Sequence, residues 1–121
     1  MKKIIFALLL SISTQTFADE WTTNDSLREV TFQVLNVIDW GQTRYIAKNL
    51  DRYYEKESAW LIGTDPSTET VDGFMLQTAV LHLAISYMLP RDWRDAFQYI
   101  TIGMKLNNTI GNAQIGIKVS F

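Results

Sequence analysis

The distribution of apolar and polar residues from position 23 to position 48 predicts a long helix. Ser26 and Glu29 have the spacing of a capping box, and the residues before them favour helix caps, so the helix should begin between Thr23 and Ser26. It is expected to extend to about Lys48. Apolar and aromatic residues fill more than half of positions 27–47 and surround the helix rather than keeping to one face. Such a helix is expected to be buried, in protein or in lipid.

A second helix is expected after a charged and aromatic connection, residues 49–70, in which one short helical turn should form around residues 54–60. Asp65 or Ser67 is placed to cap this helix, and Pro90 requires it to end at Leu89. Residues 73–89 contain no Asp, Glu, Lys or Arg, and this run is at the lower edge of membrane-spanning length. The run fits a contact with lipid, and it also fits a buried helix in a soluble bundle.

A third helix is expected to start after Pro90, with acidic residues in its first turn, and to end at Gly111. From residue 113 to the terminal Phe121, apolar and polar residues then alternate, which is the periodicity of a strand. We therefore expect a short terminal strand or an extended tail. The chain as a whole is predicted to be all-α, a small bundle of three apolar helices with a short C-terminal extended segment.

The first eighteen residues have the pattern of a secretory signal peptide. A positive start with Lys2 and Lys3 precedes an apolar run at residues 4–10, and a stretch of small and polar residues ends at Ala18. Cleavage after Ala18 leaves residues 19–121 as a single small helical domain, and the alternative is an uncleaved membrane anchor. Because cleavage removes two lysines and no acid, the formal net charge changes from −2 to −4. The expected location is the periplasm or a membrane that faces it.

Composition excludes several classes of protein. A chain of 121 residues has room for one small domain, and its average composition argues against disorder. With no cysteine and one histidine, it has no disulfide, no thiolate zinc site and no site made of several histidines. A formal net charge of −2 gives no footprint for nucleic acid, and phosphate loops and hydrolase motifs are absent. No metal and no cofactor are expected.

Each predicted helix carries one stripe of polar side chains at helical spacing. We consider these side chains as candidate binding residues. They are Asn36, Asp39, Thr43, Thr78, His82, Ser86, Gln98, Thr101 and Lys105.

The stripes have three interpretations. Polar side chains in apolar helices commonly hold helices together, and this structural role is the preferred one. They can also line a groove that binds a ligand or a partner. A catalytic site would need Asp39, His82 and Lys105 to meet in the interior, with an Asp39–His82 pair at its centre. We expect that the protein is not an enzyme, and we assign a catalytic role to none of its residues.

The chain resembles a group of small uncharacterised helical membrane proteins from bacteria and their phages, over roughly residues 25–90. The residues that carry the resemblance are 39–48 (DWGQTRYIAK), 53–55 (YYE), Glu57, 61–63 (LIG) and 65–67 (DPS). The resemblance implies apolar helices and membrane association, and it implies no particular activity.

Two functions follow from these patterns as expectations. In the first, the protein is an exported helical protein of the cell envelope, associated with a membrane, that binds or modulates another envelope component, as a phage- or prophage-type factor would. In the second, the same helices form a soluble, oligomeric periplasmic binding protein, because so small a chain has little polar surface to cover helices this apolar.

Overall fold

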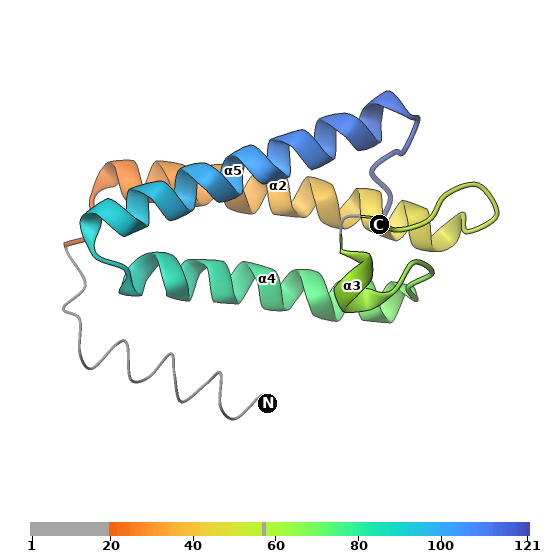
Figure 1. The fold of residues 1–121 in the computed structure, drawn as a ribbon, viewed down its shortest axis with the longest axis horizontal. Helices are drawn as coiled ribbons and strands as arrows, with labels where there is room; N and C mark the ends of the chain where they lie inside the picture. The colour runs from red at the N-terminus through yellow and green to blue at the C-terminus, as the bar shows by residue number, and fades with distance from the viewer. Residues whose placement is uncertain (1–19, 57) are drawn as a thin grey trace.

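The computed structural model describes residues 20–56 and 58–121, and within them the protein is all-α (Figure 1). Three long helices and one short helix account for most of these residues. The predicted signal peptide, residues 1–18, lies outside the described residues. The helices α2 (Thr23–Lys48) and α5 (Arg91–Gln114) run in one direction, and α4 (Thr68–Met88) runs in the other (Figure 1).

Helix α2 covers the predicted range, but a different pair of residues caps it. Thr22 is the N-cap: its hydroxyl accepts from the Asp25 backbone N–H at 3.2 Å, and the Asp25 carboxylate accepts from the Thr22 N–H at 2.8 Å. The expected Ser26–Glu29 box is therefore wrong. The Ser26 hydroxyl accepts from the indole of Trp21 instead, at 2.7 Å, and Glu29 points into the interior.

The connection and the second long helix follow the sequence pattern closely. The short helix α3 (Ala59–Ile62) is the predicted helical turn, displaced a few residues toward the C-terminus. Ser67 caps α4 by accepting from the Thr70 N–H at 3.1 Å, so the second of the two predicted caps is the one used. Leu89 is the C-cap, directly before Pro90, as predicted.

Helix α5 does not end at Gly111, as the sequence suggested, but continues to Gln114. No strand is present among the described residues, and residues 117–121 have no regular secondary structure. This tail folds back onto α2, where the Ser120 N–H donates to the Gly41 carbonyl at 3.0 Å. A Cβ at Gly41 would collide with the side chains of Val119 and Phe121, so the glycine permits this close approach.

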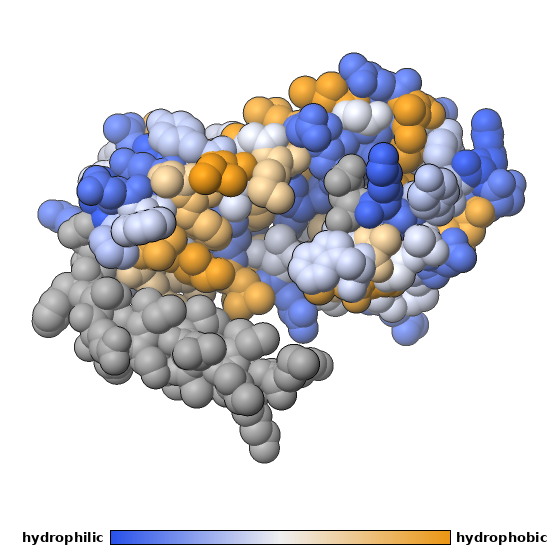
Figure 2. Space-filling model, viewed as in Figure 1, coloured by the Kyte–Doolittle hydropathy of each residue, from blue (hydrophilic) through white to orange (hydrophobic). Residues whose placement is uncertain are grey.

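The interior of the bundle is mainly polar, and many large apolar side chains are exposed on its surface. Within the described residues, five hydrophobic residues are buried, and twelve polar or charged residues are buried. On the outer face of α2, for example, Leu27 and Val30 are about 60% exposed (61% and 60%), while Asp25 is fully buried at 0%. Figure 2 shows hydrophobic residues in orange on the surface of the face viewed. Most apolar side chains of these helices are therefore not buried by the described part of the chain itself.

Within the described residues, none of the helices combines the length and the apolar character that crossing a membrane requires.

Candidate functional site

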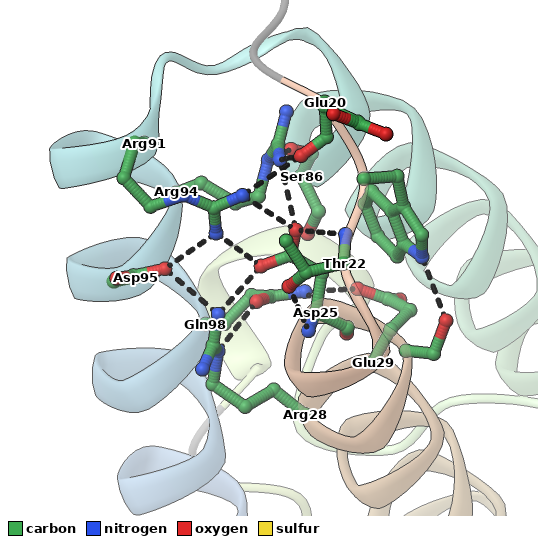
Figure 3. A network of polar contacts seen from close by, with 12 residues as sticks. Glu20, Thr22, Asp25, Arg28, Glu29, Ser86, Arg91, Arg94, Asp95 and Gln98 are labelled. Atoms are coloured by element: carbon green, nitrogen blue, oxygen red, sulfur yellow. Dashed lines mark hydrogen bonds and ion pairs between the residues drawn. The ribbon is translucent and has the colours of Figure 1, made fainter.

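The first turn of α2 places Asp25 at the centre of a cluster of three arginines (Figure 3). The Asp25 carboxylate pairs with Arg28 at 2.5 Å, with Arg91 at 2.5 Å and with Arg94 at 3.0 Å. Charge-assisted hydrogen bonds of this kind are the strong ones. Hydrogen bonds from Arg91, Thr22 and Arg94 hold the pKa of Asp25 far below its ordinary value, although burial opposes them. Asp25 therefore remains an anion throughout the physiological range.

Arg94 joins the three long helices at this end of the bundle. Its side chain is fully buried, and its Nε donates to the Ser86 carbonyl at 2.7 Å. One terminal nitrogen donates to the Tyr87 carbonyl at 3.1 Å, so the guanidinium satisfies carbonyls in the last turn of α4, which has no basic residue of its own. The guanidinium also lies 5.2 Å from the centre of the Trp21 ring.

Glu29 and His82 form a buried pair between α2 and α4. The His82 Nδ1 lies 2.9 Å from each carboxylate oxygen of Glu29, and its Nε2 lies 2.7 Å from the Thr101 hydroxyl on α5. The imidazole is stacked between Phe32, at 3.4 Å between ring centres, and Phe97, at 4.6 Å. Burial raises the pKa of Glu29, but hydrogen bonds from His82 and Gln33 outweigh it and lower the pKa overall.

The order Glu29, His82, Thr101 repeats the connectivity of a hydrolytic triad, but the surroundings differ from those of an active site. The Thr101 hydroxyl donates to the Phe97 carbonyl of its own helix at 2.9 Å, and two aromatic rings cover the faces of the imidazole. Neither His82 nor Thr101 lines either of the two cavities described below. The arrangement is suited to holding three helices together.

Asp39 has a separate set of partners farther along α2. Its carboxylate pairs with Lys105 at 2.5 Å and accepts from the Asn108 amide at 3.0 Å, both on α5. The Thr43 hydroxyl donates to the Asp39 carbonyl at 2.8 Å. The Asp39–His82 pair considered from the sequence is therefore wrong, because Asp39 pairs with Lys105 and His82 pairs with Glu29.

Four further candidate residues lie at different depths. The Asn36 amide donates to the Met75 carbonyl of α4 at 3.2 Å, and its buried oxygen has no partner among the described residues. Gln98 accepts from Arg28 at 2.8 Å. The Ser86 hydroxyl lies 3.5 Å from His82 Nδ1. Thr78 is only half-buried and donates within its own helix, so it stands apart from the interior network.

Sequence reasoning missed three central charged residues, Asp25, Glu29 and Arg94. For the two acids a signal was present. Glu29 lies seven residues before Asn36, and Asp25 lies four before Glu29, so both extend the polar stripe of Asn36, Asp39 and Thr43 toward the N-terminus. Arg94 precedes Gln98 by four residues and extends the stripe of α5 in the same way.

A further interhelical ion pair lies near the surface. The Arg44 guanidinium of α2 donates to both carboxylate oxygens of Asp72 on α4 at 2.6 Å, and the Trp40 indole donates at 2.8 Å. These hydrogen bonds lower the pKa of Asp72. In the described part of the chain, His, Asp and Glu side chains form no group of three that could hold a metal ion.

Two cavities are hollowed into the described surface. A cavity of about 530 Å³ lies between the loop after α2 and the C-terminal end of α5. A shallower one, about 390 Å³, lies along α2 over Val30, Val34 and Val37.

Comparison with models of known families, with curated proteins and with solved structures gave no match. The site is therefore interpreted from its own geometry.

Proposed function

We propose that the protein is an exported component of the cell envelope that associates with a membrane and binds or modulates another envelope component without catalysing a reaction. The observation that carries this proposal is the polarity of α2. Asp25, Glu29 and Asp39 on its inner face are buried, while Leu27 and Val34 on its outer face are 61% and 54% exposed.

Many of the outward apolar side chains form one stripe on each of the three long helices, so they are not scattered singly. On each helix they recur at intervals of three, four or seven residues, which keeps them on one side. Contiguous apolar surface of this kind marks contacts with a membrane or with other proteins. The stripes consist of Leu27, Val30, Val34 and Val37 on α2, Leu76, Val80, Leu83 and Tyr87 on α4, and Trp93, Ile100 and Met104 on α5.

The interior favours the same conclusion on energetic grounds. Moving an ion pair from water into the interior loses hydration free energy, and the attraction between the two charges offsets this loss only in part. Buried ion pairs are therefore a weak source of stability for a protein in water. The main driving force in water is burial of apolar surface, and the buried hydrophobic side chains of the described residues are few. Covering the outer stripes with lipid or protein would add the missing apolar burial. In this proposal the three long helices are the apolar helices of the bundle, and the extended segment after Gln114 closes one end.

A binding or modulating role, rather than catalysis, is supported by how the interior charges are used. Asp25, Glu29 and Asp39 each have a cationic or imidazole partner within 3.0 Å. These groups are committed to contacts between helices, and the arrangement that most resembles a catalytic one, Glu29 with His82, is enclosed by aromatic rings.

Fractionation of the expressing cell tests the proposal. The membrane pellet is extracted at alkaline pH, and the N-terminus of the recovered chain is sequenced. The proposal predicts a chain that starts at Asp19, stays with the membrane and needs detergent to be released. A chain that starts at Asp19 but is recovered in the soluble periplasmic extract contradicts it. A single oligomer of that soluble chain in size-exclusion chromatography would favour the alternative, a soluble oligomeric periplasmic binding protein.

A further inference from the structure

The larger cavity has the size and the lining of a site for a small polar ligand. Its volume of about 530 Å³ lies within the range of small-molecule sites, about 300–1,000 Å³. It lies between the C-terminal end of α5 and the loop that follows α2. Figure 1 shows these two segments at the end of the bundle opposite the N-terminus of α2, where the Asp25 cluster lies. Its polar lining includes Arg52, Tyr53, Lys56, Asn108 and Asn112.

Two asparagines of the lining are held in place by the interior network. The Asn108 amide nitrogen donates to Asp39 at 3.0 Å, and the Asn112 amide nitrogen donates to Gln42 at 3.2 Å. Neither amide oxygen accepts a hydrogen bond from any described residue, and neither is buried without a partner. Both oxygens are therefore preorganised acceptors, and they suit a ligand that carries hydroxyl or amide donors.

The lining also carries an excess of positive charge. Arg52 and Lys56 are exposed, and neither forms an ion pair with a described residue. The Glu55 carboxylate is buried and accepts from the Ser58 backbone N–H at 3.0 Å. The described lining residues thus have two cations and one anion, which leaves one positive charge for a ligand with a single anionic group.

The remaining lining offers flat and apolar surface. The Tyr53 ring is fixed by Tyr45, 5.8 Å away between ring centres, and its hydroxyl donates to the Ile115 carbonyl at 3.4 Å. Ile46 and Ile117 are buried at the cavity wall. A ligand with a compact ring would lay its apolar edges on these groups while its polar substituents reach the amides.

From this combination we propose that the cavity binds an acidic sugar, a ring with hydroxyl or acetamido groups and one carboxylate. The carboxylate lies at Arg52 and Lys56, and the hydroxyl groups donate to Asn108 and Asn112. This inference deepens the proposed binding role by naming the class of ligand, and it does not depend on whether the protein is on a membrane.

The test is a titration of the purified protein at neutral pH with two probes that differ in one lactyl ether group, which carries the carboxylate. These are N-acetylmuramic acid and the uncharged N-acetylglucosamine. We expect saturable binding of the acid, about tenfold tighter than that of the uncharged sugar, which corresponds to about one charge-assisted contact. The double variant Arg52→Gln, Lys56→Gln should remove this preference. Lys118→Gln removes one positive charge at an exposed residue that does not line the cavity, and it should keep the preference.

Equal binding of the two sugars overturns the inference, as does the absence of saturable binding of either sugar by the folded protein. A preference for the acid that survives the double variant also overturns it. Circular dichroism of each variant confirms that the helices are intact before the titrations are compared. The fractionation experiment uses no sugar, so its result does not depend on this inference. A protein that stays with the membrane but binds neither probe would refute the sugar site and leave the proposed function intact.

Discussion

Glu29 of α2 holds His82 of α4 with both carboxylate oxygens, each 2.9 Å from the imidazole Nδ1, in the centre of a bundle whose outer faces are apolar. The two residues are 5% and 4% exposed. The pair connects α2 and α4 directly, and it contacts α5 through Thr101, so all three long helices meet at this pair.

Removing either partner of this pair should destabilise the fold strongly. In His82→Ala, Glu29 loses its main partner and remains a buried carboxylate, and breaking a buried pair in this way costs about 3–5 kcal/mol. Thr101→Val removes the hydrogen bond with His82 and a bond to the Phe97 carbonyl of its own helix, leaves no charge without a partner, and should cost only about 1 kcal/mol. The free energy of unfolding, measured by urea denaturation, checks both values. Equal and small losses in the two variants would show that the pair does not hold the helices together.

Asp25 should be equally important one turn earlier in α2. Asp25→Asn leaves Arg94 buried without its anion and also weakens the cap with Thr22, so we predict a loss of about 3–5 kcal/mol. Asp95→Asn is the matched control, because Asp95 pairs with two of the same arginines but is 39% exposed in its side chain. Its loss should be below about 1 kcal/mol. Thermal melting of the two variants side by side gives the comparison, and similar melting temperatures would contradict the assignment of Asp25 as the centre of the cluster.

Acid should unfold the protein through the same carboxylates. The pKa values of Asp25 and Glu29 are lowered in the folded state, so each binds protons more readily in the unfolded chain. Their contribution to stability is complete above the unfolded pKa values, about 4, and is lost as the pH falls through the folded ones. Urea denaturation at a series of pH values should show stability decreasing below about pH 5. A free energy of unfolding that rises on acidification from pH 5 to pH 3 would contradict this prediction.

Gly41 should be required for docking of the C-terminal tail. Gly41→Ala places a methyl group against Val119 and Phe121, so the tail must leave the surface of α2 and its hydrogen bond from Ser120 is lost. Gly103→Ala is the control: it adds a methyl group in open space on α5, where it should stabilise the helix by up to about 1 kcal/mol. Amide hydrogen exchange at residues 117–121 reports docking. Unchanged protection of the Ser120 amide in Gly41→Ala would contradict the contact.

The helices could be predicted from the sequence because their boundaries depend on local signals. Ser67 and Pro90 fix the ends of α4 through a cap and a missing N–H, which neighbouring segments do not alter. The direction in which side chains face could not be predicted so easily. Periodicity shows that Asn36 and Asp39 share a side of α2, but whether that side faces inward depends on partners such as Met75 and Lys105, which are distant in sequence.

The end of α5 was missed for a related reason. Gly111 is a typical stop signal, but no positive φ is found there, and the helix continues to Gln114, two residues before Gly116, whose φ is 91°. Both Gly111 and Gly116 lie near the end of this helix in the sequence, and only Gly111 was predicted to stop it. Contacts of Asn112 with Gln42 on α2 favour continuation past the first, and these contacts are invisible in the local sequence.

The most direct test of the central claim, that the apolar outer stripes contact a membrane, compares the wild-type protein with Val30→Ser, Val34→Ser, Val37→Ser. These three residues are exposed, so their replacement should leave the interior network and the helical circular dichroism unchanged. Alkaline extraction of the membrane pellet is then carried out on cells that express each protein. Our account predicts that the wild-type chain resists extraction and that the triple variant is released while still folded. A wild-type chain found in the soluble fraction, or a folded variant that stays with the membrane as firmly as the wild-type chain, would contradict it.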